Sequence, residues 1–268
     1  MTPMTAPTEA PLFAARVEAL PALELWLLKD DFGRLTQEMT APLAALLSEA
    51  EHDRRPRYRR EEQRNQFLCS RALLRCALSR HQPVAPTAWV FEHTAQGKLQ
   101  LAPPYSKTGL RFNLSHTQDL IVCAVARQRT VGADAEYSRR PCDYMAIAQR
   151  YFTPSEIHAL TIPLEAQRKA RFFEFWTLKE AYVKALGHGL SYAFNCFYFI
   201  LGESRITIND SLDPDADDKW TFYSLAFNEH YRIALCLGRN SIQAEPRISL
   251  YSLSIDRLVE TALGFAAT

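Results

Sequence analysis

The chain has 268 residues, of which 47% are hydrophobic and 23% are charged, a composition typical of soluble globular proteins. With 31 Lys and Arg residues against 30 Asp and Glu residues, the net charge is close to zero, which disfavours nucleic-acid binding through a general positive field. No apolar stretch in the sequence is long enough to span a bilayer, so we expect no membrane contact. The six cysteines are scattered without a Cys-x-x-Cys pair, which is typical of reduced thiols in a cytoplasmic protein.

The first half of the chain begins with residues 1–20, which we expect to form a flexible leader because they are rich in Pro, Thr and Ala and lack the features of a signal peptide. Beyond this leader, short apolar runs between turn signals predict strands, and apolar stripes at helical spacing predict helices. The predicted elements are a strand at 23–28, helices at 42–52 and 61–80, and strands at 89–93, 110–114 and 120–126.

The second half repeats this order of elements. Thr153-Pro154-Ser155-Glu156 combines a helix N-cap, a proline at the first helical position and an acid three residues after the cap, and so predicts a helix start. A longer helix is expected to end at Gly187, because glycine commonly terminates helices. The predicted elements are a strand at 131–136, helices near 143–151, after 153 and over 164–186, and strands at 194–200, 205–208, 220–227 and 231–237.

The repeated order predicts an α+β protein of two pseudo-symmetric halves, residues 21–128 and 129–250, followed by a C-terminal tail at 251–268. Each half is expected to have a mainly antiparallel sheet with packed helices, because the links between strands are too short for crossover helices. Ligand sites favour the junction of such halves, so we expect the functional site there.

Two segments carry most of the chemical information. In Val131-Gly132-Ala133-Asp134-Ala135-Glu136, the two acids are two residues apart on a predicted strand and therefore share a face. Neighbouring carboxylates repel one another unless a cation lies between them, and Mg²⁺ prefers such oxygen ligands while leaving positions for substrate phosphates. Exposed strand acids without any metal are the plainer explanation of this segment taken alone.

The second segment is Phe175-Trp176-Thr177-Leu178-Lys179-Glu180-Ala181-Tyr182-Val183-Lys184-Ala185. Glu180 and Lys184 share one helix face, and Lys179 is next to the acid. A surface ion pair would explain this spacing. However, the surrounding residues are apolar on nearly every side of the helix, which predicts a largely buried helix whose charges need partners or a function.

Three further segments are candidates for anion binding. The stretch Arg54-Arg55-Pro56-Arg57-Tyr58-Arg59-Arg60 holds five arginines, whose guanidinium groups pair well with phosphate oxygens. Ser115 and His116 end a predicted strand and point to opposite faces of it, which disfavours a hydrolytic dyad and favours phosphate contacts. Gly97 and Lys98 lie in a predicted turn, where glycine backbone and a lysine could approach a phosphate.

Taken in order, Phe112-Asn113-Leu114-Ser115-His116 and the two segments above resemble the Sfp-type 4′-phosphopantetheinyl transferases over about residues 45–200. The family transfers the phosphopantetheine arm of coenzyme A to a serine of an apo acyl, peptidyl or aryl carrier protein and releases adenosine 3′,5′-bisphosphate. The resemblance therefore implies the fold of that family, a Mg²⁺-dependent (or Mn²⁺-dependent) enzyme, coenzyme A as substrate, carrier proteins as partners and the duplicated, monomeric form.

The resemblance also implies roles for individual residues. Asp134, Glu136 and Glu180 would hold the metal, with Glu180 (or Glu136 through a water molecule) as the catalytic base and Lys184 neutralising or protonating the leaving phosphate. The implied contacts to coenzyme A comprise Arg54, Gly97, Lys98, Ser115, His116, Asp134, Lys179 and Lys184. Two positions depart from the family pattern: Ala135 replaces a larger apolar residue, and Glu51 stands where some relatives carry a lysine.

Two other functions are compatible with the same residues. A Mg²⁺-dependent phosphohydrolase would use the same acids with water as the nucleophile, but it leaves the arginines and the lysine pair unexplained. A catalytically silent protein that binds coenzyme A or carrier domains would not need the acids and Lys184 to be intact. The carrier itself is expected to dock near residues 137–160.

Overall fold

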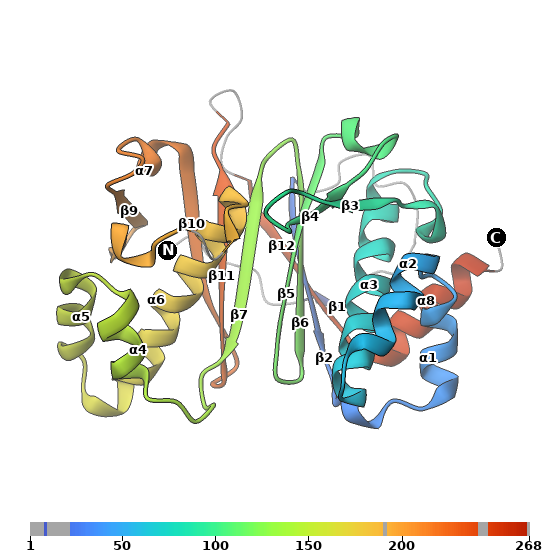
Figure 1. Cartoon of the computed structure of the whole chain (residues 1–268), viewed down its shortest axis with the longest axis horizontal. Helices are drawn as coiled ribbons and strands as arrows, with labels where there is room; N and C mark the ends of the chain where they lie inside the picture. Colours follow the sequence, from blue (N-terminus) through green and yellow to red (C-terminus); the bar gives the residue numbers. More distant parts are fainter. Residues whose placement is uncertain (1–7, 10–21, 190–191, 241–245, 267–268) are drawn as a thin grey trace. The chain divides into compact units, whose positions relative to one another are not determined.

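The computed structural model describes residues 8–9, 22–189, 192–240 and 246–266. Most of the predicted leader, residues 1–20, lies outside this part of the chain. The described residues form two compact units: unit 1 contains 93–99 and 129–240, and unit 2 contains 8–9, 22–92, 100–128 and 246–266. Figure 1 labels the elements of both units.

Unit 1 is built around the three-stranded antiparallel sheet β10-β11-β7, with β7 at Val131–Tyr137, β10 at Trp220–Phe227 and β11 at Tyr231–Gly238. Helix α6, Glu165–Leu186, packs along β7 and β11. The remaining elements of the unit are α4 (Tyr144–Tyr151), α5 (Pro154–Thr161), the antiparallel pair β8 (Phe197–Leu201) and β9 (Ile206–Asp210), and α7 (Ala216–Lys219).

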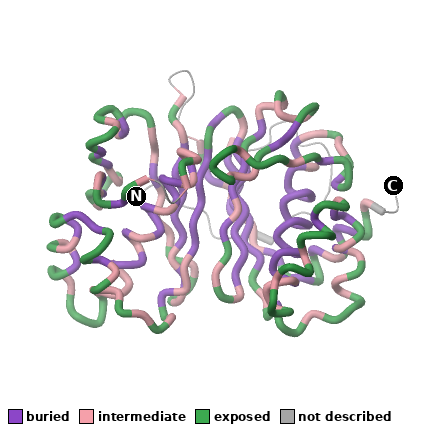
Figure 2. Tube along the Cα trace, in the orientation of Figure 1, coloured by how far each residue is buried: buried purple, intermediate pink, exposed green. Residues whose placement is uncertain are grey.

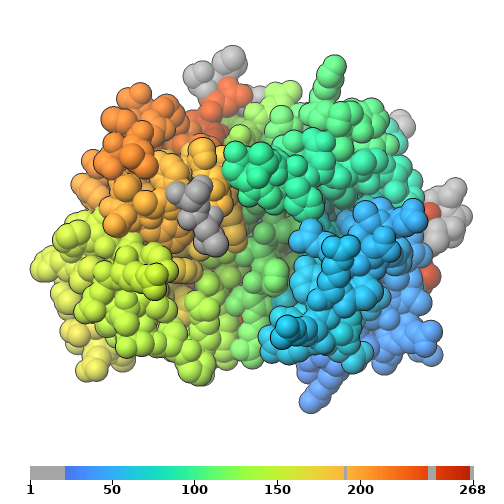
Figure 3. Space-filling model, in the orientation of Figure 1, coloured from blue at the N-terminus to red at the C-terminus, as the bar shows by residue number. Residues whose placement is uncertain are grey.

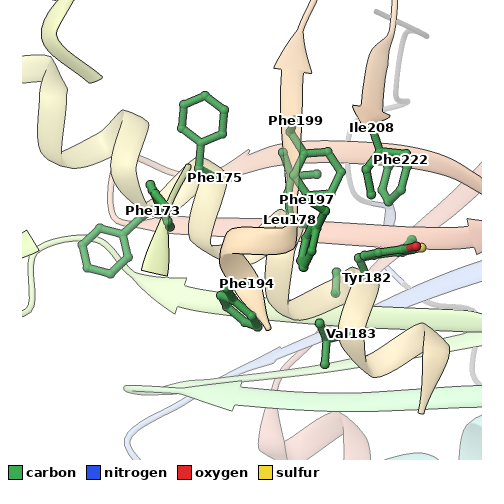
Figure 4. Close-up of a cluster of buried hydrophobic side chains, with 14 of the residues drawn as sticks. Phe173, Phe175, Leu178, Tyr182, Val183, Phe194, Phe197, Phe199, Ile208 and Phe222 are labelled. Atoms are coloured by element: carbon green, nitrogen blue, oxygen red, sulfur yellow. The ribbon is translucent and has the colours of Figure 1, made fainter. Parts of the chain in front are cut away.

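Aromatic side chains from several of these elements form the core of unit 1. Figure 4 shows Phe173, Phe175 and Tyr182 of α6 with Phe194 and aromatic residues of β8 and β10. Such rings bury large apolar areas, so this cluster is a main source of stability for the unit. It also explains why α6 is apolar on nearly every side, as the sequence indicated, because the helix is covered by the sheet on one side and by α5 and β8 on another.

Unit 2 contains the five-stranded sheet β1-β12-β2-β6-β5, in which β2 pairs antiparallel with β6 and β6 antiparallel with β5. Strand β12 joins β2 in parallel, and β1 joins β12 in parallel. Helix α3 packs on β6 and β5, and α1 and α8 pack beside it. The bounds are β1 Thr8–Glu9, β2 Leu23–Lys29, β5 Leu110–Thr117, β6 Leu120–Arg127, β12 Ile248–Leu253, α1 Gln37–Ala44, α2 Glu49–Arg54, α3 Glu61–His81 and α8 Ile255–Ala266.

The α+β class with mainly antiparallel sheets is confirmed, and buried residues follow β7 and α6 in unit 1 and β6 and α3 in unit 2 (Figure 2). The predicted C-terminal tail is corrected, since residues 251–266 form the end of β12 and all of α8. Ile255, Leu258 and Ala262 are buried at helical spacing, so α8 is held by its apolar face. No helix within the described residues is long and apolar enough to cross a membrane.

Most predicted elements are present with shifted ends, and two differences have clear causes. The predicted helix at 42–52 is divided into α1 and α2, because Ser48 caps α2 in a capping box with Glu51. The predicted strand at 89–93 shortens to β3, Phe91–His93, which pairs with β4, Leu99–Leu101. The helix start at Thr153 and the glycine end of α6 are confirmed by a capping box at Thr153 and by a left-handed Gly187.

Candidate functional site

Strand β7 presents its two acids on the face that carries Gly132, as the alternation of a strand requires. In the antiparallel register Asp134 lies opposite Ala234 and Glu136 lies opposite Arg232 of β11. Asp134 is buried, and Glu136, nearer the end of the strand, is half-buried. The strand therefore carries one carboxylate into the interior and a second one toward its end.

Gly132 allows helix α6 to approach this face of β7. A Cβ atom at this position would collide with the carbonyl oxygen of Ala181 and would lie 2.5 Å from the backbone nitrogen of Ala185. Only a residue without a side chain fits between the strand and the helix here. Strand β7 therefore needs a glycine at position 132 so that helix α6 can pack against it.

The close packing brings Lys184 of α6 onto Asp134 of β7. The Lys184 Nζ donates a hydrogen bond to Asp134 Oδ1 over 2.5 Å, with 29% of the lysine side chain and 7% of the aspartate side chain exposed. Glu180 lies one turn earlier on the same helix face and is half-buried. The two acids of β7 thus lie close to Glu180 and Lys184 of α6 within unit 1.

The three carboxylates are close enough to affect one another. The pKa of Glu136 is raised to about 7, mainly by burial and also by the charges of Asp134 and Glu180, while Arg140 and Lys184 oppose the increase. Burial and the charge of Asp134 also raise the pKa of Glu180, and Lys184 opposes this. Arg140 pairs with Glu136 over 3.2 Å. Both glutamates are therefore easier to protonate than an ordinary carboxyl group.

Metal binding by Asp134, Glu136 and Glu180 remains a prediction. Among the residues that the structure describes, no three His, Cys, Asp or Glu side chains are arranged so that they could hold a metal ion, and Asp134 is engaged by Lys184. The chemistry of the donors fits a hard cation, because all three supply carboxylate oxygens and the clustering itself raises the pKa of two of them. A divalent ion would relieve this repulsion.

The predicted turn at Gly97 and Lys98 lies at the end of α6. Gly97 has the positive φ angle of 85° that favours glycine, and the Lys98 Nζ donates to the carbonyl oxygen of Ala185 over 3.1 Å. Ala185 directly follows Lys184, so Lys98 is tied to the last turn of the helix that carries Glu180 and Lys184. Lys98 also satisfies a carbonyl group in the last turn of the helix.

Lys179 does not join this cluster, which corrects the expectation that it contacts coenzyme A. Its side chain is fully buried, and its Nζ lies 2.9 Å from Glu156 Oε2. The ammonium group also donates to the carbonyl oxygens of Phe194 and Phe197 over 2.8 and 2.6 Å. Burial lowers the pKa of Lys179 to about 8 despite the nearby Glu156 carboxylate. Lys179 therefore belongs to the aromatic core, on another side of α6.

The other predicted contacts lie in unit 2. Ser115 is buried on β5 and His116 is exposed, in agreement with the prediction that their side chains point to opposite faces. Arg54 ends α2, and its guanidinium lies 5.9 Å from the centre of the Phe67 ring. These residues carry groups that can bind phosphate, and their contacts to coenzyme A stay predictions.

The sequence did not reveal a buried ion cluster in unit 2. Arg71 and Arg75 of α3 are both buried, and Glu51 lies 3.7 Å from Arg71 Nε and 2.6 Å from Arg75 NH2. Arg75 also donates to the carbonyl oxygens of Pro86 and Trp89. Their positions on either side of the apolar run Ala72-Leu73-Leu74 were the available signal, since buried arginines need an acid nearby. Glu51, which stands where some relatives carry a lysine, thus pairs with these two arginines.

Comparison with known proteins agrees with this geometry. A family model described as the 4′-phosphopantetheinyl transferase superfamily matches residues 130–236, and a model described as 4′-phosphopantetheinyl transferase, N-terminal, matches residues 35–128. Together these regions include both chemical segments and the basic stretch around Arg54.

Three relatives extend this similarity. The 4′-phosphopantetheinyl transferase HetI of Nostoc sp. is 40% identical over 149 residues, which cover 56% of this chain and 63% of that protein. The Synechocystis sp. relative slr0495 is 30% identical over 177 residues, covering 66% of this chain and 69% of that protein. A phosphopantetheinyl transferase of Thraustochytrium sp. is 29% identical over 241 residues, covering 85% and 83%.

The chain belongs to the 4′-phosphopantetheinyl transferase superfamily. The predicted family is thereby confirmed. The match to HetI spans 63% of that relative's length.

Proposed function

We propose that this chain transfers the 4′-phosphopantetheine arm of coenzyme A to a serine of an apo carrier protein, releasing adenosine 3′,5′-bisphosphate. The observation that carries the proposal is the meeting of Asp134 and Glu136 of β7 with Glu180 and Lys184 of α6. Displacement at phosphorus depends on positioning and neutralisation of charge more than on covalent chemistry by the protein. Buried acids beside a lysine suit that demand.

In the proposed reaction, Glu180 removes the proton from the carrier serine, whose oxygen then attacks the phosphorus that carries the pantetheine arm. The bond to the adenosine bisphosphate breaks, and Lys184 neutralises or protonates the departing phosphate oxygen. The raised pKa of Glu180 supports the role of base, because a carboxylate that is easier to protonate accepts a proton more readily. Glu136, acting through a water molecule, is the alternative base.

Asp134, Glu136 and Glu180 are proposed to hold Mg²⁺ or Mn²⁺, which when bound would neutralise the pyrophosphate of coenzyme A. The carboxylate-only donor set supports this assignment. Lys184 contacts Asp134 directly, so it would adjust its position when a cation and phosphates enter. The metal ion and the Lys184 ammonium group would then both offer positive charge to the phosphates of coenzyme A.

At the nucleotide end, Lys98, Gly97, Ser115, His116 and Arg54 are proposed to contact the phosphates of coenzyme A. Lys98 is the member of this group with a direct contact to the site helix, through the carbonyl oxygen of Ala185. His116 and Arg54 are exposed at the surface of unit 2 and can meet a ligand.

The partner is proposed to be an apo acyl, peptidyl or aryl carrier domain that docks near residues 137–160. In this segment, α4 and α5 (yellow-green in Figure 3) lie at the surface of unit 1. The near-neutral charge supports an enzyme that does not bind nucleic acid, and the free cysteines support a cytoplasmic location. A monomer without membrane contact is proposed from the resemblance to the duplicated form of the family.

Intact-protein mass spectrometry tests the proposal. Apo carriers of the fatty-acid, polyketide and peptide types would be incubated with the chain, coenzyme A and Mg²⁺, with and without EDTA. We expect a gain of one phosphopantetheine in at least one carrier and no gain with EDTA. Release of inorganic phosphate without carrier modification would instead indicate a phosphohydrolase, and binding of coenzyme A without turnover would indicate a silent binding protein.

A further inference from the structure

Lys179 and Glu156 form an ion pair inside unit 1 that the proposed chemistry does not use. Both side chains are fully buried, and Lys179 Nζ lies 2.9 Å from Glu156 Oε2. The ammonium group also donates to the carbonyl oxygens of Phe194 and Phe197, and it lies 4.2 Å from the centre of the Phe197 ring. With three acceptors for three donors, this ammonium has no hydrogen left for a substrate.

Glu156 connects the pair to two other elements. Its Oε2 accepts hydrogen bonds from the backbone nitrogen and the hydroxyl of Thr153, at 3.0 and 3.1 Å, and the first of these belongs to the capping box that starts α5. Its Oε1 accepts a hydrogen bond from the backbone nitrogen of Phe199 on β8 over 3.2 Å. The middle of α6 is therefore tied through one lysine to the start of α5 and to β8.

Packing alone does not require charges here. Removing two charges from water is unfavourable, and apolar residues of similar volume often replace a buried ion pair without loss of stability. Apolar contacts also leave a helix free to turn slightly about its own axis, whereas hydrogen bonds to fixed carbonyl groups have direction. What the pair adds to the aromatic core is therefore a defined orientation of α6.

That orientation matters because Lys179 directly precedes Glu180 and lies five residues before Lys184. Successive residues of an α-helix are about 100° apart, so fixing one side chain fixes the direction of the others. A rotation of about 20° would displace side-chain ends by about 2 Å. Displacements of this size can lower catalytic rates about 100-fold.

We propose that the Glu156–Lys179 pair is a positioning device that fixes the rotation of α6 and thereby directs Glu180 and Lys184 at the acids of β7. The proposal rests on the proposed function, since it assigns a role in aligning that site. Glu156 and Lys179 are positioning residues, and they act on the reaction through Glu180 and Lys184.

The double variant Glu156→Gln/Lys179→Met tests the proposal, because it removes both charges and keeps the volume. We expect it to fold, with kcat lowered at least about 10-fold and the KM for coenzyme A within about 2-fold of wild type. Each single variant should melt about 5 to 10 °C lower than the double variant, since it leaves one buried charge without a partner. A double variant with wild-type kcat would overturn the proposal, as would a raised KM for coenzyme A at unchanged kcat.

Arg171→Gln/Glu174→Gln is the matched control, because it removes a partly exposed pair on the same helix, 3.0 Å apart, and should leave kcat unchanged. If the double variant does not fold, Glu156→Asp decides: it keeps the charge but shortens the acid, and should lower kcat by about 3-fold at constant KM. A normal kcat in that variant would contradict the positioning role.

A readout independent of turnover separates this proposal from the proposed function. Hydrogen exchange and near-ultraviolet circular dichroism report the packing of residues 165–186, including Trp176 of the aromatic core. We expect both signals to change in the folded double variant and to stay constant in the control. Unchanged signals would refute the positioning role even if the wild-type chain modified no carrier.

Discussion

The ion pair between Lys184 and Asp134 joins side chains that are 50 positions apart in the chain. It shows that segments 131–136 and 175–185 are in contact, although neither segment alone predicts this contact. The two paired residues also affect the nearby acids in opposite directions: Lys184 lowers and Asp134 raises the pKa of Glu136 and Glu180. The chemistry of the site is therefore a property of the group of residues.

Lys98→Ala separates two roles of one side chain. As a phosphate contact at the nucleotide end, Lys98 would be missed more by coenzyme A than by dephospho-coenzyme A, which lacks the 3′-phosphate. We expect the KM for coenzyme A to rise about 10-fold, the size of one lost charge-assisted hydrogen bond. The KM for dephospho-coenzyme A should change less than about 3-fold in steady-state kinetics.

Lys98→Gln is the control, since it keeps a donor for the carbonyl oxygen of Ala185 and removes the charge. Equal losses for both substrates in Lys98→Ala, restored by Lys98→Gln, would show that the lysine serves only the end of α6.

The site residues also show which features the sequence could predict. Asp134, Glu136, Glu180 and Lys184 followed from strand and helix periodicity, because those periods state which side chains share a face. Lys179 was predicted as a site residue because it is next to Glu180 in the sequence. Its side chain points about 100° away from that of Glu180 around the helix axis and enters the core. Its partner Glu156 belongs to a capping box, which the sequence indicates as a helix start but not as an ion-pair partner.

At the scale of elements, the packing of α6 on β7 is the feature that builds the site. Gly132 makes that packing close, since any Cβ there would overlap the backbone at Ala181. The sequence indicated the strand and the helix, but it contained no signal that the glycine of one faces the backbone of the other. Contacts of this kind depend on tertiary packing, which local periodicity does not encode.

Gly132→Ala is predicted to separate these two elements. Overfilling a tightly packed interface commonly costs 1–3 kcal/mol, and here the clash involves backbone, so we expect a loss of about 3 kcal/mol or more in the free energy of unfolding. Urea unfolding measures this loss, and transfer activity of the folded variant should also fall because Lys184 moves away from Asp134.

Gly264→Ala provides the comparison, since a Cβ at this exposed position of α8 meets nothing within 4 Å. That variant should be stabilised by about 0.5–1 kcal/mol, as expected for alanine in place of glycine in a helix. Similar stability for both variants would contradict the packing described for Gly132.

At the scale of the whole molecule, the sequence predicted the α+β class and most elements, while the ends of the chain were less predictable. Residues 251–268 were expected to be a tail, but 251–266 belong to regular elements. They form the end of β12 and all of α8, and β12 pairs in parallel with β2, whose residues are more than 200 positions earlier in the chain. Pairing between such distant segments leaves no local pattern in the sequence.

The buried cysteines make the stability of the molecule depend on pH. Burial raises the pKa of Cys69 and Cys76 to about 12 and also raises the pKa of Cys123 and Cys236. The unfolded thiols ionise near pH 9, so the stabilisation is complete below pH 9 and is lost as the pH rises further. Lys179, with its lowered pKa, has the opposite effect in this range.

Between pH 9 and 10 we expect each of these cysteines to lower the free energy of unfolding by about 1 kcal/mol, and the net loss including Lys179 to be about 3 kcal/mol. Urea titrations under reducing conditions at both pH values measure it. Cys76→Ala should reduce the loss by about 1 kcal/mol. A stability that is constant between these pH values would contradict the burial of the thiols.

The central claim is that Glu180 works with the acids of β7 to transfer phosphopantetheine. The measurement that tests it most directly is a time course of carrier mass in the presence of coenzyme A and Mg²⁺, comparing wild type, Glu180→Gln and the control Glu174→Gln on the same helix. We predict conversion of the carrier by wild type and by Glu174→Gln, and at least about 100-fold slower conversion by a folded Glu180→Gln. Near-normal conversion by Glu180→Gln would contradict the proposed site.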